Sequence, residues 1–231
     1  SRATMETVRR TVGGRLELVY PGIAMPAVPA ARCGLRAMVG AAEDARVVGL
    51  VGTLTPIKGH RVFIDAAALV CAAHDNVHFV CIGGPGAAAV DAYIDGLHAL
   101  RARHGLDARV HFMGHRADAA ALVADFDVAT VCTLPPGEGF GMVIVEAMAR
   151  AVPVVATRAG ATPEIITHGE TGLLIPPGDA RALARAVGGL LVDAARRRAI
   201  GQAGLAACRA RFDLVETIRR VESVYDRVIA D

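Results

Sequence analysis

Short apolar runs alternate along the chain with longer segments in which apolar residues recur at helical spacing. The runs are rich in β-branched residues and apolar at consecutive positions, so each expected strand should be buried on both faces. Such burial is typical of a parallel sheet covered by helices, and the pattern predicts an α/β fold with a doubly wound, Rossmann-like parallel sheet. A ligand of such a sheet lies beyond the carboxyl ends of the strands, where the strand order reverses. The expected strands are residues 47–54, 77–84, 109–114, 127–132, 153–157 and 172–176.

The two ends of the chain have a different pattern from the middle. Residues 1–44 form a lead-in, with a helix expected to about Arg10, a strand-like stretch at Leu16–Tyr20 and then a proline-rich linker. The α/β domain is expected to span residues 45–212, and residues 213–231 should form a separate final helix. Beyond Asp179, a suitable N-cap, helices are expected at 181–192, 194–211 and 214–230.

Composition narrows the class of protein. Hydrophobic residues make up 53% of the chain, enough for a buried core, and no apolar run approaches the ~20 residues that span a bilayer. The net charge of +2 comes from 25 basic and 23 acidic residues mixed along the chain, which argues against nucleic acid or a membrane surface as partner. The first residues lack the layout of a signal peptide, and the missing initial Met suggests a cut or processed end. We expect a soluble protein.

Cysteine and histidine usage points to no metal or disulfide framework. The five cysteines are widely spaced, form no CxxC pair and lie partly in apolar runs, which is typical of core thiols in a reducing cytoplasm. Eight histidines are present, and the pairs that are close in sequence include His74 with His78 and His98 with His104. Neither pair has a third ligand nearby, so no metal site is expected.

The glycine-rich segment Gly137–Gly141 follows an expected strand and precedes an expected helix at 142–150. Free amides at a helix start suit a phosphate or sugar oxygen, and glycines allow a ligand to approach the backbone. Glu138 lies in this loop, while Glu146 lies on the helix and leans back towards the same place. The ordinary alternatives are a solvated loop carboxylate for Glu138 and a surface pair with Arg150 for Glu146. The apolar flanks of Glu146 favour a buried carboxylate that needs partners such as ribose hydroxyls.

Lys58 lies just before an expected helix at 61–73, where a cation opposes the helix dipole. A bound anion would relieve that conflict, although an exposed lysine remains the alternative. The run Thr162-Pro163-Glu164 reads as an N-cap, a first helical residue and a first-turn acid, which is a structural role.

Glu138 and Glu146, with seven residues between them, resemble the EX7E motif of family-4 and related retaining glycosyltransferases, the group 1 glycosyl transferases. The similarity extends over almost the whole chain in ordered landmarks. VGTLTPIKGH resembles the family's GRLxxxKG segment, FVCIGGPG its VGxGP and RVHFMGHRAD its VxFxG loop. PVVATRAGATPEIITHGETGLLIPPGD follows the family's PVVAT, GGxPE, G-TG and PPGD landmarks.

The resemblance implies a GT-B enzyme, with two Rossmann-like domains and a cleft between them, of which this chain is the C-terminal, nucleotide-sugar-binding half. It implies that Glu146 binds the ribose hydroxyls and that Glu138, the catalytic candidate, lies beside the donor sugar. Lys58 would neutralise the diphosphate, and the loop at Gly114, His115 and Arg116 would contact the base mainly through backbone. The remaining candidate donor contacts are Gly52, Thr53, Gly139 and the amides of Phe140, Gly141, Met142 and Val143.

The implied reaction transfers a hexosyl group from a UDP-, GDP- or ADP-linked sugar to an acceptor hydroxyl with retention of configuration. No cofactor is implied, and metal independence is expected because Lys58 and helix amides can stabilise the leaving diphosphate. Glu138 could act as a nucleophile or orient the sugar, and orientation is favoured. The missing N-terminal acceptor domain is the expected partner, the final helix would cross back to it, and the fragment alone should be inactive.

Two departures from the family pattern stand out. The family commonly has an arginine where this chain has Thr53, so donor affinity is weaker, Arg158 or Arg116 compensates, or the donor is used differently. Ala161 replaces the second glycine of the GG pair, which matters only if that position needs positive φ.

Three other functions remain as alternatives. A nucleotide-sugar epimerase or a phosphorylase shares the GT-B fold, and Thr53 gives some support to a non-catalytic nucleotide-binding or interaction domain. An NAD-binding domain is disfavoured because no GxGxxG follows the first expected strand.

Overall fold

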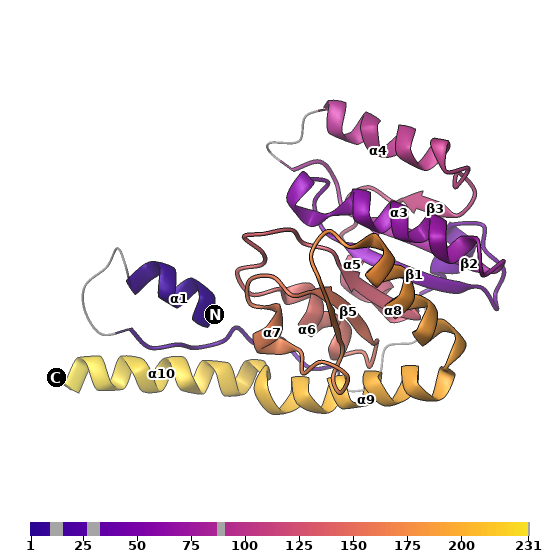
Figure 1. The fold of residues 1–231 in the computed structure, drawn as a ribbon. Coiled ribbons are helices and arrows are strands. Elements are labelled where there is room, and N and C mark those ends of the chain that lie inside the picture. The colour runs from indigo at the N-terminus through magenta and orange to yellow at the C-terminus, as the bar shows by residue number, and fades with distance from the viewer. Residues whose placement is uncertain (10–15, 27–32, 87–90, 231) are drawn as a thin grey trace.

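A computed structural model describes residues 1–9, 16–26, 33–86 and 91–230. Six strands form one sheet in the order β3-β2-β1-β4-β5-β6, and every neighbouring pair is parallel (Figure 1). The predicted doubly wound parallel sheet is confirmed, and the strands are slightly shorter than expected. They are β1 Arg46–Val51, β2 Val77–Ile82, β3 Val110–Phe112, β4 Val128–Val131, β5 Val154–Thr157 and β6 Leu173–Ile175.

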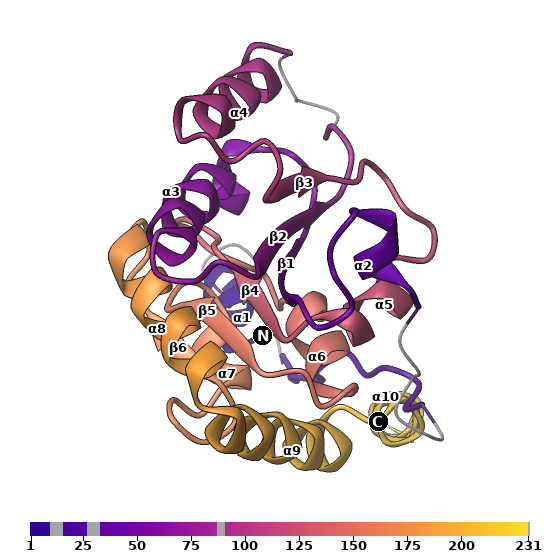
Figure 2. The ribbon, with the colours of Figure 1, turned by 90° about the vertical axis from the view of Figure 1, so that its right-hand side faces the viewer.

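Helices cover both faces of the sheet, which explains the consecutive apolar positions of the strands (Figure 2). Along β2, Phe79 and Cys81 belong to one buried cluster, whereas Val80 and Ile82 belong to the other. The first cluster packs under α3 His60–Cys71, α4 Asp91–Arg103 and α8 Ala180–Val192, and the second under α2 Leu35–Met38, α5 Ala119–Leu122 and α6 Met142–Met148. The other helices are α1 Arg2–Arg9, α7 Thr162–Ile165, α9 Ala194–Arg211, α10 Leu214–Ala230 and two 3-10 turns, Pro56–Lys58 and Val123–Asp125.

Helix ends largely follow their sequence signals. The Asp179 carboxylate accepts a hydrogen bond from the Ala182 amide at 2.8 Å and caps α8 as predicted. The prediction of Thr162 as an N-cap is wrong by one residue, because α7 begins at Thr162 and Ala161 precedes it. The Thr162 hydroxyl is buried and donates to the Thr157 carbonyl, so it holds the end of β5.

The strand-like stretch at Leu16–Tyr20 forms no strand, so that prediction is wrong. A strand needs a neighbouring strand, and this segment lies against the start of α10, whose Thr217 hydroxyl donates to the Tyr20 carbonyl at 3.3 Å. The nearest pairing is a single bridge between Ile23 and Asp213. The helix predicted to about Arg10 is present as α1, and residue 10 itself lies outside the described residues.

Two helices, α1 and α10, extend from the same side of the sheet domain, with residues 16–20 running between them (Figure 1). Helix α10 has a row of exposed apolar side chains, namely Leu214, Val215, Ile218, Val221, Tyr225, Val228 and Ile229. Within the described ranges, no helix combines the length and apolarity needed to cross a membrane.

Candidate functional site

A cavity of about 320 Å³ lies where the strand order reverses, between β1 and β4. Its floor comes from the carboxyl ends of these two strands: Leu50 and Val51 from β1, and Val131, Cys132 and Thr133 at and beyond the end of β4. Connections leave β1 and β4 in opposite directions, so no helix fills the space between them. The cavity is therefore where the strand pattern predicts a ligand.

The glycine-rich loop supplies the next part of the wall. Phe140, Gly141, Met142 and Val143 line the cavity, and α6 begins at Met142. Gly141 has a φ of 97°, a conformation that favours glycine. Across the described part of the chain, none of these four backbone amides donates a hydrogen bond to another residue. Four consecutive unpaired donors at a cavity wall favour an anionic or hydroxyl-rich ligand.

The side chains of Lys58 and Glu138 meet at the cavity. Lys58 lies beyond the end of β1, and Glu138 lies beyond the end of β4. The Lys58 Nζ lies 2.6 Å from Glu138 Oε1, and the side chains are 28% and 17% exposed. The Thr133 hydroxyl donates to the same carboxylate oxygen at 2.6 Å. The cavity thus holds one cation and one carboxylate that neutralise each other, and Glu138 is not the solvated loop carboxylate of the ordinary alternative.

Gly59 brings Lys58 to this position. Its φ is 71°, and a Cβ at this residue would lie 2.0 Å from the carbonyl oxygen of Cys132. Only glycine therefore fits between the 3-10 turn that carries Lys58 and the end of β4. Lys58 is the only lysine in the chain.

Glu146 lies on α6, one turn beyond Met142, and is half-buried. Its carboxylate forms no hydrogen bond or ion pair with any residue that the structure describes. The Arg150 guanidinium donates instead to the main-chain oxygen of Glu146 at 2.9 Å, so the alternative surface ion pair does not form. A half-buried carboxylate without a protein partner is suited to ligand hydroxyls.

Neither Glu146 nor the remaining predicted site residues line this cavity. Gly52 lies beside the Lys58 side chain, and a Cβ there would lie 3.6 Å from Lys58 Cδ. Thr53 is exposed, and Gly139 turns its carbonyl to the Thr4 hydroxyl at 3.2 Å.

The base-loop candidates Gly114, His115 and Arg116 follow β3, which is two strands away from β1. The Arg116 guanidinium is held by Asp118 at 2.6 Å, and this pair is exposed. Arg116 is therefore bound to an acid of its own loop, not held near Lys58.

Sequence reasoning missed Leu50, Val51, Val131, Cys132 and Thr133. Each ends or follows an apolar strand, so the residue types carry no signal of a site. Their role depends on β1 and β4 being neighbours, which is a property of the strand order.

His60 is a further residue without a sequence signal. It is fully buried at the start of α3, directly after Gly59, and neither ring nitrogen has a well-formed hydrogen bond to a described residue. Burial lowers the pKa of His60 to about 4, and the nearby backbone of Thr55 and Gly52 offsets this only in part. The imidazole is neutral at pH 7.

The histidine pairs that are close in sequence do not pair in space. His78 contacts His111 across β2 and β3 at 3.0 Å, His104 contacts Asp65 at 2.9 Å, and His98 packs on Phe112. No group of three or more potential metal ligands occurs among the residues described. All five cysteines are free thiols; Cys81, Cys132 and Cys208 are buried, and Cys33 is exposed.

The backbone conformation at Ala161 explains why alanine is tolerated there, one of the two departures from the family pattern. Its φ is −83°, whereas the preceding Gly160 has a φ of 58°. Alanine therefore fits at the second position of the GG pair without strain, and only the first position requires glycine.

Among known proteins, sequence relatives of this chain are D-inositol 3-phosphate glycosyltransferases. That of Mycolicibacterium gilvum is 33% identical over 220 residues, which cover 94% of this chain and 48% of the relative. That of Corynebacterium glutamicum is 32% identical and covers 94% of this chain and 53% of the relative. The chain thus spans about half the length of these relatives.

Solved glycosyltransferase structures have the same fold. HepE of Anabaena, crystallised in complex with UDP-glucose, superimposes with a TM-score of 0.89 at 30% identity and covers 98% of this chain and 62% of HepE. The sucrose-phosphate synthase of Thermosynechococcus elongatus has a TM-score of 0.86 at 28% identity and covers 100% of this chain and 57% of the synthase. The fold is the Rossmann-like half of a GT-B architecture. The sequence model of the family "glycosyl transferases group 1" matches residues 45–193, and the chain belongs to that family.

Proposed function

We propose that this chain is the donor-binding domain of a retaining glycosyltransferase and that a nucleoside diphospho-sugar binds in the cavity between β1 and β4. The observation that carries the proposal is the meeting of Lys58 and Glu138 on a cavity whose wall presents four unpaired amides. A cation and free amides suit a diphosphate, and a carboxylate beside them suits sugar hydroxyls. A UDP-glucose complex of the similar HepE supports this ligand class.

Each predicted residue has a proposed role. Lys58 and the amides of residues 140–143 hold the diphosphate, and Glu138 lies beside the sugar. Glu146, whose carboxylate has no partner among the described residues, binds the ribose hydroxyls. The exposed loop Gly114, His115 and Arg116 contacts the base through its backbone, and Gly52, Thr53 and Gly139 support these contacts. The base is uracil, guanine or adenine, and no cofactor takes part.

In the proposed reaction the bond between the anomeric carbon and the diphosphate oxygen breaks, and the acceptor oxygen forms a new bond to that carbon. The acceptor proton passes to the departing phosphate. Lys58 and the amides stabilise the charge that develops on the leaving diphosphate, without a metal ion. Glu138 orients the sugar, since its carboxylate is held in place by Lys58 and Thr133.

The proposal assigns only half of an enzyme to this chain. The relatives are about twice as long, and the apolar row on α10 is exposed over 17 residues of helix. An acceptor domain, preceding this one in the complete protein and packed against α10, would complete the active site in the cytoplasm. The isolated chain should bind donor and transfer no sugar.

Thr53 lowers the affinity that we expect for the nucleoside diphosphate. It is exposed and neutral, and the Arg116 side chain is engaged by Asp118, so the second cation of the family pattern has no replacement at Arg116. Of the two candidates for compensation, Arg158 at the end of β5 remains, and it is exposed. We expect micromolar or weaker binding of nucleoside diphosphates.

A thermal-shift panel of UDP, GDP, ADP and their glucose conjugates tests the proposal. A ligand at a hundred times its dissociation constant should stabilise the chain by about 2.7 kcal/mol. Glu146→Ala should abolish that stabilisation, while Glu222→Ala, on an exposed part of α10, should retain it. Failure of every nucleotide to bind the folded wild-type chain would refute the donor site and favour a non-catalytic interaction domain.

A further inference from the structure

Three segments that are far apart in sequence meet beside the cavity: residues 20–23, the α9–α10 connection and α7. The Ile23 amide donates to the Phe212 carbonyl at 2.9 Å, and the Leu214 amide donates to the Ile23 carbonyl at 3.0 Å. The Thr217 hydroxyl of α10 donates to the Tyr20 carbonyl at 3.3 Å. The N-terminal segment and the start of α10 are thereby fixed to each other.

The Tyr20 ring links this meeting point to the cavity wall. Its centroid lies 5.7 Å from that of Phe140 and 6.0 Å from that of Phe212, and the Phe140 and Phe212 rings are 5.5 Å apart. Phe140 lines the cavity, whereas Tyr20 and Phe212 do not. The side chain of a cavity residue is therefore held by two rings from outside the cavity.

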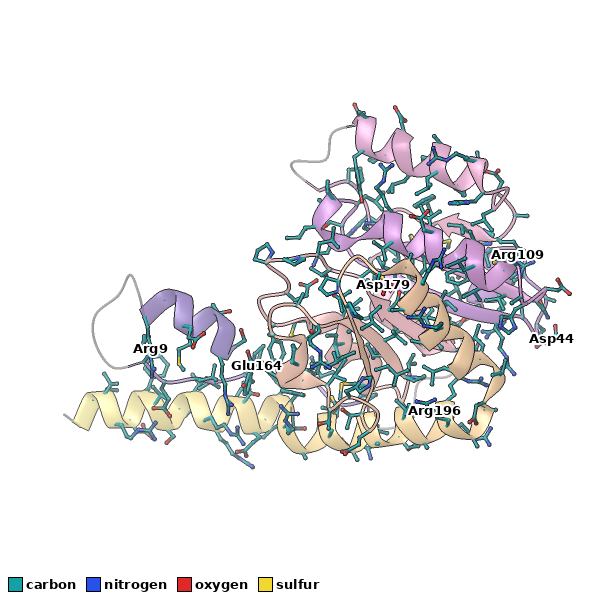
Figure 3. All side chains as sticks on the ribbon, viewed as in Figure 1. Arg9, Asp44, Arg109, Glu164, Asp179 and Arg196 are labelled. Atoms are coloured by element: carbon teal, nitrogen blue, oxygen red, sulfur yellow. The ribbon has the colours of Figure 1, made fainter. Side chains whose placement is uncertain are left out.

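The Tyr20 hydroxyl forms a second link, through α7. It donates to Glu164 Oε2 at 2.7 Å, and the Arg2 amide donates to the same oxygen at 2.8 Å. Figure 3 shows Glu164 at the edge of the sheet domain that faces α1. The start of α7 in turn holds the glycine-rich loop, because the Ala161 amide donates to the Glu138 carbonyl at 3.0 Å.

Burial and the Glu164 hydrogen bond raise the pKa of Tyr20, so its hydroxyl remains a donor at neutral pH. The ring of Tyr20 contacts Phe140. Its hydroxyl reaches the backbone of Glu138 indirectly, through Glu164 and the neighbouring Ala161 amide. Both links start from one side chain in the segment that runs between α1 and α10 (Figure 1).

We propose that Tyr20 is a positioning residue of the donor site, which holds the Glu138–Phe140 loop through its ring and its hydroxyl. This inference rests on the proposed function, in that the cavity is taken to bind the donor. It adds that the shape of the cavity depends on how residues 20–23 lie against α7 and α10. A displacement of α1 or α10 would thus be transmitted to the residues beside the sugar and diphosphate.

The test compares Tyr20→Phe, which removes the hydroxyl, with Tyr20→Leu, which removes both links. Tyr225→Leu is the matched control, because Tyr225 is 65% exposed on α10. Calorimetry with UDP should show binding weakened about twofold in Tyr20→Phe and about tenfold in Tyr20→Leu, and unchanged in the control. Denaturation measured alongside establishes that each variant is folded at the assay temperature.

A second readout needs no nucleotide. Hydrogen exchange of the Ala161 amide reports whether the Glu138 carbonyl is held, and we expect about tenfold faster exchange in Tyr20→Leu but not in Tyr225→Leu. UDP binding and Ala161 exchange that both match wild type in Tyr20→Leu, with only a lower melting temperature, would show a purely structural role and overturn the inference. If wild type binds none of UDP, GDP and ADP, the proposed function fails, and the exchange measurement alone decides whether Tyr20 positions the loop.

Discussion

Replacement of the Glu138 carboxylate by its neutral amide tests how Lys58 is shared between the protein and a ligand. Lys58 is paired with Glu138 at 2.6 Å. A diphosphate that binds Lys58 has to displace this carboxylate or tolerate its charge. Glu138→Gln retains an oxygen for Lys58 and for the Thr133 hydroxyl and removes only the charge. We therefore expect the variant to bind UDP more tightly than wild type, although it loses the group proposed to orient the sugar.

The size of the gain follows from the exposure of the pair. The side chains are 28% and 17% exposed, so the interaction lies between that of a surface pair and that of a buried one. The charge of Glu138 competes with the diphosphate for Lys58. Its removal should strengthen UDP binding by about 1 kcal/mol, which corresponds to roughly fivefold tighter binding. The gain should shrink as salt is added, because screening weakens charge interactions at partly exposed sites.

Calorimetry with UDP on a double-mutant cycle isolates the effect. Lys58→Met should weaken UDP binding about tenfold, and Glu138→Gln should give no gain in that background, since no cation remains to be released. Equal or weaker UDP binding by Glu138→Gln, or the same gain without Lys58, would refute the reasoning.

The cycle has a spectroscopic counterpart. Because Lys58 is the only lysine, reductive ¹³C-methylation labels only this residue and the terminal amine. The Lys58 methyl resonance should move on UDP addition, and Glu138→Gln should move it in the free protein.

Two further predictions concern the neighbours of Lys58. Gly59→Ala places a Cβ at 2.0 Å from the Cys132 carbonyl, so it should destabilise the chain by about 1–3 kcal/mol more than Gly105→Ala, which has similar φ but open space, in urea unfolding. Burial lowers the pKa of His60 to about 4 from 6.5, so its contribution to stability is complete above pH 6.5 and is lost as the pH falls towards 4. The loss should reach roughly 3 kcal/mol, and His60→Gln should be less sensitive to pH between 7 and 5; an identical pH slope in both proteins would contradict the assignment.

Much of the fold could be predicted from the sequence because its signals are local. Consecutive apolar positions indicate strands buried on both faces, and such strands require helices on either side. Asp179 marks a helix start because its own side chain caps the nearby amides. Glu138 and Glu146 could be singled out as candidates in the same way, since their spacing lies within one loop and one helix. Leu16–Tyr20 failed as a strand because its composition says nothing about whether a partner strand is adjacent.

What only the tertiary structure decided is which distant segments become neighbours. The strand order places β1 beside β4, and this brings Lys58 within 2.6 Å of a carboxylate 80 positions later in the chain. The same order makes ordinary residues such as Leu50 and Thr133 part of a cavity wall. Tyr20 acquires its contacts with Phe140 and Glu164 only through the packing of α7 and α10. Sequence periodicity records which face of an element is buried, whereas the partner across that face is selected by the packing of the whole chain.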